Sequence, residues 1–484
     1  MQFLVIQRIL GLLLMVFSST LLPPVLVGWI YQDGAILPFI EGFLLILTAG
    51  FILYIPVRKQ IKELRLRDGF MVVVIFWCVL GAVGGLPIYL SGAGGEISVT
   101  DAVFESISGL TTTGATVITG LDHLPHSLLF YRQQLQWLGG MGIIVLAVAV
   151  LPMLGIGGMQ LYRAETPGPI KDNKLTPRIT GTAQMLWYVY LGLTIACILA
   201  YWAAGMNLFD AIGHAFSTVA IGGFSTHDAS MGYFESEMIE MIAVVFMLLG
   251  GVNFALHFSV VKSRSLSVYM RDAEFKTYLS LLFLVSVITV SYLYVTTTFD
   301  TFTEAFFEGI FHVVSIGTTT GFTTREYYAW PSFLPILLLY LSFMGGCAGS
   351  TGGGMKVIRI LLLFKQGIRE LKRLLHPSAQ IAVKIGKKAL PENVVEAVWG
   401  FFAAYFAISV VMILLLMASG LDQVTAFSAV AACMNNLGPG LGEVGLNYAS
   451  INDFSKWVLC LAMLLGRLEI FTLLVLFTPQ FWSK

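Results

Sequence analysis

The sequence predicts an all-α polytopic membrane protein, and three observations support this fold class. The chain of 484 residues is 57% hydrophobic and only 12% charged. Its mean hydropathy is +0.82. A soluble protein of this length could not bury so many apolar side chains in domains of ordinary size. Apolar runs of about 20 residues, the length that crosses a bilayer, recur along most of the chain. The formal net charge is zero, so no overall field indicates a nucleic-acid partner.

Hydropathy divides the chain into ten expected spans. They run over residues 3–30, 36–56, 70–91, 128–152, 180–205, 237–261, 275–297, 332–364, 392–420 and 455–478. The first is longer than the apolar core of a signal peptide and lacks a small-x-small cleavage site, so we interpret it as an uncleaved span. Four shorter apolar segments lie between spans, and their length favours re-entrant helices over crossing ones. They end near Thr113, Gly222, Thr320 and Leu437.

The distribution of lysine and arginine predicts the orientation of these spans. With the N-terminus in the cytoplasm, 24 of the 28 basic residues fall on internal connections or at the chain ends. The outer side keeps only Arg132, Arg325 and Lys456, and Arg467 lies inside the last span. This arrangement satisfies the positive-inside rule. We therefore expect both termini in the cytoplasm and all four short segments entering from outside.

The four short segments share one frame. Aligned on their last glycine, they read DAVFESISGLTTTG (101–114), DAIGHAFSTVAIGG (210–223), EGIFHVVSIGTTTG (308–321) and TAFSAVAACMNNLG (425–438). Each starts with a residue suited to a helix N-cap or first turn. These residues are Asp101, Asp210, Glu308 and Thr425. The following spans share a second mark, LGG, LGG, MGG and LGR, so that Arg467 replaces a glycine in the fourth.

This repeat predicts four units, each made of a span, a short helix, a glycine loop and a second span. The units occupy residues 70–162, 163–262, 263–375 and 376–484, and two extra N-terminal spans occupy residues 1–69. Four loops that enter from one side can meet on a shared axis. Together the units would surround one central pore.

The chemistry of such loops indicates a cation. Backbone without internal hydrogen bonds cannot face lipid, so the loops must line water or protein. The short helices would direct their partially negative C-terminal ends toward the axis, and glycine permits the positive φ angles that turn carbonyls inward. The threonine hydroxyls would serve as further oxygen ligands or hold the loop. Because these oxygens are neutral and no carboxylate ring occurs, a monovalent cation fits better than a divalent one.

On these residues the chain resembles the TrkH-type membrane subunits of bacterial Trk potassium-uptake systems, within the Trk/Ktr/HKT superfamily. The resemblance covers the whole chain, and TTTGA, AIGGF, TTTGF and NNLGP look like the family's four filter segments. In that family a glycine in every filter goes with potassium over sodium. Gly114, Gly223, Gly321 and Gly438 fill these places. The second segment has two candidate glycines, Gly222 and Gly223. We choose Gly223, because GGFST of the second segment then aligns with GFTT of the third.

The resemblance implies that backbone carbonyls in these four segments hold potassium, and by extension rubidium. The filter residues are Thr111, Thr112, Thr113, Gly114, Ala220, Ile221, Gly222, Gly223, Thr318, Thr319, Thr320, Gly321, Asn435, Asn436, Leu437 and Gly438. Potassium is then the transported ion, and the location is the bacterial cytoplasmic (inner) membrane.

The stretch FMGGCAGSTGGGMK (343–356) interrupts the outgoing span of the third unit. Glycine at this density cannot sustain a helix across a membrane. Close helix packing through small residues is the alternative, but the density and the mid-membrane position favour a mobile loop that obstructs the pore, as the resemblance also implies. This predicted gate loop, residues 345–354, contains Gly345, Gly346, Gly349, Ser350, Thr351, Gly352, Gly353 and Gly354. It does not match a Walker A motif, and we expect no nucleotide site in this chain.

Arg467 is predicted to lie near the middle of its span, where an arginine costs about 2.5–3.5 kcal/mol on insertion scales. Facing the pore, it would repel cations just below the filter, and the resemblance supports this role. The alternative is a structural ion pair with Glu469 or with Glu105.

Three further polar residues share one position, nine residues before the filter glycine. They are Glu105, His214 and His312, with Ala429 in the fourth unit. We expect them to hydrogen-bond the short helices to neighbouring spans rather than to bind a metal.

The internal connection 365–391 has leucine and isoleucine at helical spacing with basic residues between them. It is expected either to lie at the lipid headgroups or to dock a cytosolic regulator, for which residues 163–178 are a second candidate. The resemblance implies that this regulator is a TrkA-like ring of nucleotide-binding RCK domains and that two membrane subunits pair as a homodimer.

We considered two alternative functions, and the sequence supports both less well than a potassium-selective pore. A sodium- or proton-coupled potassium symporter would need an intramembrane carboxylate pair, to which only Glu469 and Glu105 come close. An intramembrane enzyme would need a nucleophile with a base, or a metal cluster. No GxSxG, HExxH or paired aspartates occur in any expected span, so we expect no enzymatic activity.

Overall fold

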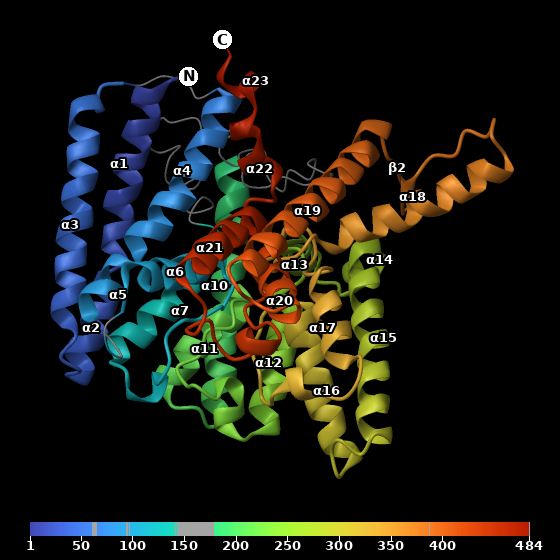
Figure 1. Ribbon diagram of the computed structural model, residues 1–484, viewed down its shortest axis with the longest axis horizontal. Coiled ribbons are helices and arrows are strands. Elements are labelled where there is room, and N and C mark those ends of the chain that lie inside the picture. The colour runs from blue at the N-terminus through green and yellow to red at the C-terminus, as the bar shows by residue number, and fades with distance from the viewer. Residues whose placement is uncertain are drawn as a thin grey trace.

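The computed structural model describes residues 1–60, 65–92, 95, 97–140, 142, 179–386 and 388–483, and the statements that follow concern these residues. Nearly all of their regular structure is helical (Figure 1). The N-terminus and the C-terminus lie at the same end of the molecule (Figure 1).

Four short helices correspond to the predicted re-entrant segments: α6 (Val99–Leu110), α11 (Leu208–Ala220), α16 (Phe302–Gly317) and α20 (Gln423–Met434). The other helices are α1 (Phe3–Ser19), α2 (Leu22–Tyr31), α3 (Ile36–Tyr54), α4 (Leu66–Gly84), α5 (Leu86–Ser91), α7 (His126–Gly140), α10 (Ile179–Ala203), α12 (Glu237–Gly250), α13 (Phe254–Ser263), α14 (Ser267–Arg271), α15 (Ala273–Val295), α17 (Leu334–Ser342), α18 (Val357–Leu375), α19 (Glu392–Ala418), α21 (Asp453–Arg467), α22 (Phe471–Leu474) and α23 (Pro479–Trp482). Short 3₁₀ helices are η1 (Ile55–Val57), η2 (Leu121–His123), η4 (Ser230–Phe234), η5 (Tyr327–Ala329), η6 (Gly442–Val444) and η7 (Val475–Phe477).

Within the described residues, six helices are long and apolar enough to cross a membrane. They cover Phe3–Tyr31, Ile36–Val57, Arg67–Ser91, Gln184–Ala203, Ala273–Val295 and Val394–Ala418. Two further expected spans are sharply bent, by 95° between α12 and α13 and by 107° between α21 and the segment Phe471–Phe477. The predicted span 128–152 begins in α7 and continues outside the described residues, and 332–364 is interrupted between α17 and α18. The polytopic helical class is confirmed, and the count of ten spans stays a prediction.

The connection that follows α18 contains a small strand pair that the sequence analysis did not anticipate. Strand β1 (Lys384–Ile385) pairs antiparallel with β2 (Lys388–Ala389). Figure 1 shows α18 extending away from the body of the helices. The hairpin lies back against the first half of α18, where Val383 packs with Ile358 and Leu362. Near its C-terminal end α18 exposes Leu371, Leu374 and Leu375, the last two by 79% and 78%.

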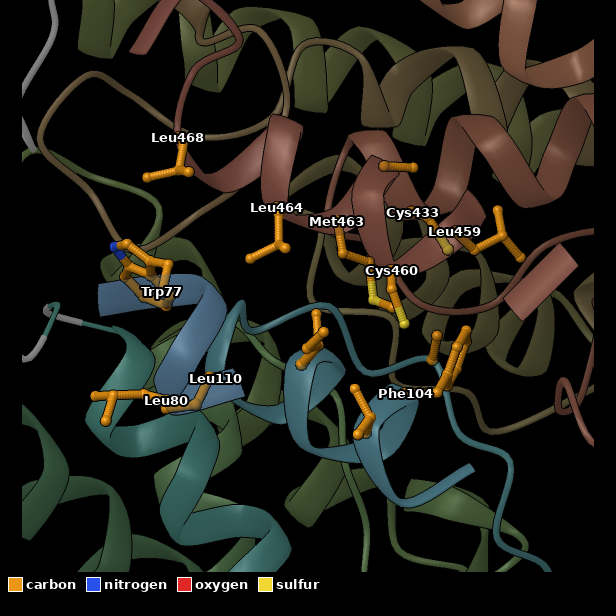
Figure 2. Close-up of a cluster of buried hydrophobic side chains, with 14 of the residues drawn as sticks. Trp77, Leu80, Phe104, Leu110, Cys433, Leu459, Cys460, Met463, Leu464 and Leu468 are labelled. Carbon is orange, nitrogen blue, oxygen red and sulfur yellow. The ribbon is translucent and has the colours of Figure 1, made fainter. Parts of the chain in front are cut away.

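The largest apolar core joins helices from opposite ends of the sequence. It packs α1, α4, α6 and α7 against α19, α20 and α21. Figure 2 shows part of this cluster, to which α4 contributes Trp77, α6 contributes Phe104, and α21 contributes Cys460 and Met463. Other cores join α15 and α17 to α20 and join α10 and α11 to α16. These cores hold all four short helices in the interior.

Candidate functional site

Each of the four short helices begins with a side-chain cap. The capping residues are Ser98, Asn207, Thr301 and Asp422, and each accepts a backbone N–H from the third residue of its helix. Asp101, Asp210 and Thr425 are these third residues, so their predicted place in the first turn is confirmed. The expectation is wrong for Glu308, because α16 begins at Phe302 and places Glu308 in its second turn.

The four loops after these helices adopt the same unusual backbone conformation. The last glycine of each loop has a positive φ: Gly114 +81°, Gly223 +79°, Gly321 +82° and Gly438 +100°. The residue two places earlier does as well: Thr112 +54°, Ile221 +54°, Thr319 +71° and Asn436 +54°. A β-branched residue in this region is strained and persists only where its surroundings hold it. Gly222 does not have a positive φ, so Gly223 is the geometric equivalent of the other three glycines.

The loops contact one another in a closed ring. A carbonyl oxygen of the next loop lies where each glycine would carry a Cβ atom. This oxygen belongs to the residue just before the next loop's glycine. The pairs are Gly114 with Gly222, Gly223 with Thr320, Gly321 with Leu437, and Gly438 with Thr113. Any Cβ at the first three would overlap that oxygen. The ring therefore requires glycine at these positions for space as well as for φ.

Threonine hydroxyls brace the first and third loops. Thr111 Oγ1 donates to the Ile107 carbonyl over 2.7 Å and lies 2.7 Å from Thr113 Oγ1. Thr318 makes the equivalent bonds, to the Val314 carbonyl over 2.7 Å and with Thr320 Oγ1 over 2.8 Å. Of the two roles expected for these hydroxyls, the geometry gives them that of holding the loop.

Carboxamides brace the fourth loop. Asn435 accepts from the Tyr405 hydroxyl over 2.7 Å and donates to Ser342 Oγ over 2.9 Å. Asn436 Nδ2 donates to Thr113 Oγ1 over 2.9 Å, which ties the fourth loop to the first across the ring closure.

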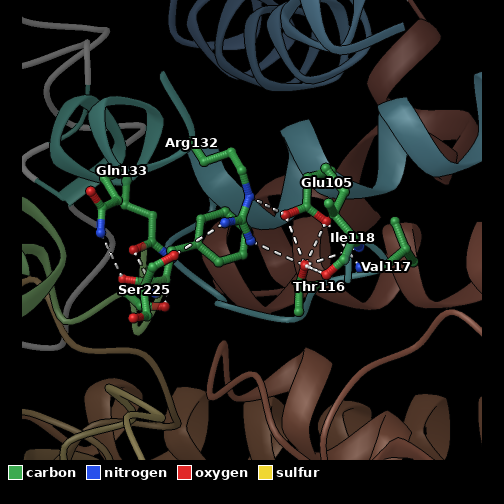
Figure 3. A network of polar contacts seen from close by, with 10 residues as sticks. Glu105, Thr116, Val117, Ile118, Arg132, Gln133 and Ser225 are labelled. Atoms are coloured by element: carbon green, nitrogen blue, oxygen red, sulfur yellow. Dashed lines mark hydrogen bonds and ion pairs between the residues drawn. The ribbon is translucent and has the colours of Figure 1, made fainter. Parts of the chain in front are cut away.

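The polar residues nine places before the glycines hold the segments that follow the glycine loops. Glu105 accepts from Arg132 Nε of α7 over 2.7 Å and from the Val117 N–H over 3.0 Å (Figure 3). Both members of this ion pair are buried. The predicted bond to a neighbouring span is thus confirmed for Glu105. It is wrong for His214 and His312, whose Nε2 atoms contact the chain just after their own loops, at Ser225 Oγ and the Arg325 carbonyl.

The glycine-rich segment between α17 and α18 reaches the ring of loops. The Gly353 N–H donates to Thr319 Oγ1 over 2.7 Å, and the Gly354 N–H donates to the Asn435 carbonyl over 2.9 Å. Thr351 Oγ1 donates to the Val219 carbonyl, at the end of α11, over 2.9 Å. This segment therefore contacts the second, third and fourth loops or their helix ends.

Charged side chains hold the middle of the same segment and the helix that follows it. Glu274, in the first turn of α15, accepts the N–H of Ala348 over 2.8 Å and that of Ile358 over 3.1 Å with one carboxylate oxygen. Lys356 donates from Nζ to the Gly352 carbonyl. The segment is thus anchored in its middle and at the start of α18.

Arg467 lies between the first loop and the glycine-rich segment. Its guanidinium contacts Thr112 Oγ1 at 3.4 Å, the Thr351 carbonyl at 3.3 Å and the carbonyls of Gly139 and Gly140. The carboxylates considered as its partners are bonded to other arginines, Glu469 to Arg359 and Glu105 to Arg132. Arg467 and the glycine-rich segment together contact all four units of the ring.

A ring of four glycine loops with a glycine-rich segment and an arginine against it invites comparison with known ion-transport proteins. A family model, TrkH, described as cation transport protein, matches residues 36–484. The chain belongs to the TrkH family. The Trk system potassium uptake protein TrkH of Vibrio parahaemolyticus is 59% identical over the full length of both chains. The Trk system potassium uptake protein TrkG of Escherichia coli K12 is 42% identical over 99% of each.

The crystal structure of the potassium transporter TrkH from Vibrio parahaemolyticus is similar to this fold over its whole length. The TM-score is 0.91 at 56% identity, with all of both chains covered. The predicted resemblance to the TrkH family is therefore confirmed.

Two polar residues of this TrkH-family chain escaped the sequence analysis. Glu274 stands one residue before the predicted span 275–297, where no sequence feature distinguishes it from an ordinary interfacial carboxylate. Gln136 lies in the predicted span 128–152, together with the polar residues Gln133 and Gln134. Such a run within a membrane span was the available signal, because uncompensated polar side chains are rare there.

Proposed function

We propose that the chain carries potassium across the bacterial cytoplasmic membrane through a filter formed by its four glycine loops. The observation that carries this proposal is the closed ring in which four loops share one backbone conformation. Residues 70–162, 163–262, 263–375 and 376–484 each supply one loop, and the relatives named above are potassium uptake proteins.

The filter would work through backbone oxygens. Carbonyls among the sixteen filter residues would replace the hydration shell of a dehydrated cation. The short helices end at the loops, so their partial negative charges favour a cation there. Potassium, and rubidium with its similar size and charge, would bind at these neutral oxygens.

The gate would be the segment 345–354 with Arg467. Each of its hydrogen bonds to the loops contributes about 1 kcal/mol net, so that releasing the segment from the loops costs a few kcal/mol. A binding partner can supply that much, since coupling free energies of about 1–3 kcal/mol per ligand are typical. Arg467 adds a positive charge below the filter, and its withdrawal would remove a barrier to cations.

The partner that opens the gate would act through α18. This helix begins directly after the gate loop and extends away from the body with exposed leucines. A cytosolic TrkA-like ring of RCK domains, bound to a homodimer of this chain with both termini in the cytoplasm, fits this arrangement. Membrane lipid is the other surface that α18 would contact.

A sodium- or proton-coupled symporter is less well supported. Coupling requires carboxylates free to bind the driving ion. Glu105 is paired with Arg132 and Glu469 with Arg359, so neither is available as an uncompensated charge. Flux down the potassium gradient is the simpler mechanism.

The test is ion flux through the purified chain in liposomes, rubidium against sodium, with Gly321→Ser and a matched control. Serine at Gly321 would overlap the Leu437 carbonyl at a φ of +82°, so discrimination should fall about tenfold. Gly192→Ser, in open space on α10, should behave as wild type. Uptake that depends on a sodium or proton gradient, or an unaltered Gly321→Ser, would refute the proposal.

A further inference from the structure

The second filter loop differs chemically from the other three. Its sequence AIGGF contains two adjacent glycines and neither the threonine pair of loops one and three nor the asparagines of loop four. Two glycines in succession have more accessible backbone conformations than any other pair. This loop therefore needs a brace from elsewhere to hold the same φ angles as its counterparts.

The side chain of Gln136 supplies that brace. It belongs to α7, in the neighbouring unit, and is completely buried. Its Nε2 donates to the Gly222 carbonyl over 2.6 Å, and its Oε1 accepts the Phe224 N–H over 3.0 Å. One carboxamide thus holds the peptide groups on both sides of Gly223.

The packing shows how closely this carboxamide fits. A Cβ at Gly222 would lie 2.5 Å from Gln136 Oε1 and 2.8 Å from Nε2, so the amide lies directly against the backbone. The Gly222 carbonyl is also the oxygen that fills the side-chain position of Gly114. Gln136 therefore fixes the junction between the first and second loops.

We propose that Gln136 is a positioning residue that sets potassium-over-sodium discrimination by holding the second filter loop. This inference rests on the proposed function, since it assumes that the loops are the filter. Neutral-oxygen filters discriminate through small differences in how oxygens are placed. Losing two hydrogen bonds at one of four loops should lower the rubidium-to-sodium flux ratio about fivefold.

The first variant is Gln136→Met, which keeps the length of the side chain and removes both bonds. The matched control is Gln133→Met on the same helix, where a buried glutamine donates to the Phe224 carbonyl over 3.3 Å, beyond the filter glycine. We expect the flux ratio to fall in Gln136→Met and to stay within about twofold of wild type in Gln133→Met. Equal ratios in wild type and Gln136→Met would overturn the proposal.

Gln136→Glu gives a second readout that loss of packing would not produce. An ionised carboxylate still accepts the Phe224 N–H but cannot donate to Gly222, whereas a protonated one can do both. We expect discrimination in this variant to be poor at alkaline pH and to recover as the pH falls, while wild type shows no such dependence. A pH-independent, wild-type ratio in Gln136→Glu would overturn the proposal.

The same measurements separate this inference from the proposed function. If wild type itself fails to favour rubidium over sodium, the filter assignment fails. If wild type discriminates and the Gln136 variants discriminate equally well, only the role of Gln136 fails.

Discussion

The backbone N–H of Gly353 donates a hydrogen bond to the hydroxyl of Thr319 over 2.7 Å. Thr319 is one of the four loop residues with a positive φ, and Gly353 belongs to the segment proposed as the gate. The bond joins the proposed gate directly to the third glycine loop. A change in the position of residues 345–354 is therefore expected to alter the conformation of that loop.

Removing that hydroxyl should loosen the gate. Thr319→Val keeps the β-branched shape and leaves the Gly353 N–H without its acceptor, so rubidium flux through the chain alone should rise about fivefold. Thr319→Ser keeps the hydroxyl and is the matched control. Liposome uptake measures both variants, and equal flux in Thr319→Val and wild type would show that this bond does not hold the gate.

Glu274 should have a larger effect, because one carboxylate oxygen holds both Ala348, inside the proposed gate loop, and Ile358, at the start of α18. In Glu274→Leu these two partly buried N–H groups lose their acceptor, at about 1–3 kcal/mol each. We expect faster hydrogen exchange across residues 345–358 and increased flux. The control is Asp272→Asn, which alters the neighbouring carboxylate that caps α15 at the Phe275 N–H. Unchanged exchange in Glu274→Leu would contradict the anchoring role.

Two substitutions at Arg467 separate its charge from its hydrogen bonds. Arg467→Lys keeps the positive charge but cannot reproduce the forked donors that reach Thr351 and Thr112. Arg467→Gln removes the charge. If repulsion limits flux, Arg467→Gln should raise single-channel conductance severalfold and Arg467→Lys should not. Equal increases in both variants would indicate that the arginine acts only as an anchor.

His227, which follows the second glycine loop, should make the stability of the fold depend on pH. Its ring contacts Asp122 at 2.5 Å and Asp210 at 3.2 Å. Burial alone would lower the pKa of His227, but the hydrogen bonds to these two carboxylates outweigh burial and raise that pKa. The pair of carboxylates therefore stabilises the fold fully below the ordinary histidine pKa of about 6.5, and this contribution is lost as the pH rises through the raised value.

The size of this contribution should be on the order of 1 kcal/mol, because the site is partly exposed. Thermal unfolding of the purified protein should show a lower Tm above the raised pKa than near pH 6 in wild type. In His227→Gln the difference should shrink. His376→Gln, at an exposed histidine after α18, is the control, and an equal pH dependence in His227→Gln and wild type would contradict the prediction.

Much of this architecture follows from the sequence because length and hydropathy dominate in a bilayer. The short helices were placed from their length, and the break in the third outgoing span from its glycine density. No comparable feature of the sequence predicted the bend after Arg467. It occurs through positive φ at Glu469 and Ile470, two residues that local preference would keep in a helix.

The conformation of the second loop could not be predicted from the sequence either, because residues distant in the chain determine it. Isoleucine disfavours a positive φ, so nothing local predicts it at Ile221. The angle is held by contacts from other parts of the chain, among them the carboxamide of Gln136 beside Gly222. The choice of Gly223 over Gly222 rested on alignment alone, and only the backbone distinguishes the two.

The ring is closed by one polypeptide, with Gly438 of the last loop against Thr113 of the first. In a pore built from four identical chains, any replacement in the filter enters all four positions at once. In this chain each of the four loops has its own sequence, so a substitution changes only one of them. Evolution, or an experimenter, can alter one loop of the proposed filter and leave three intact. Ion preference could then change in smaller steps than in a symmetric tetramer.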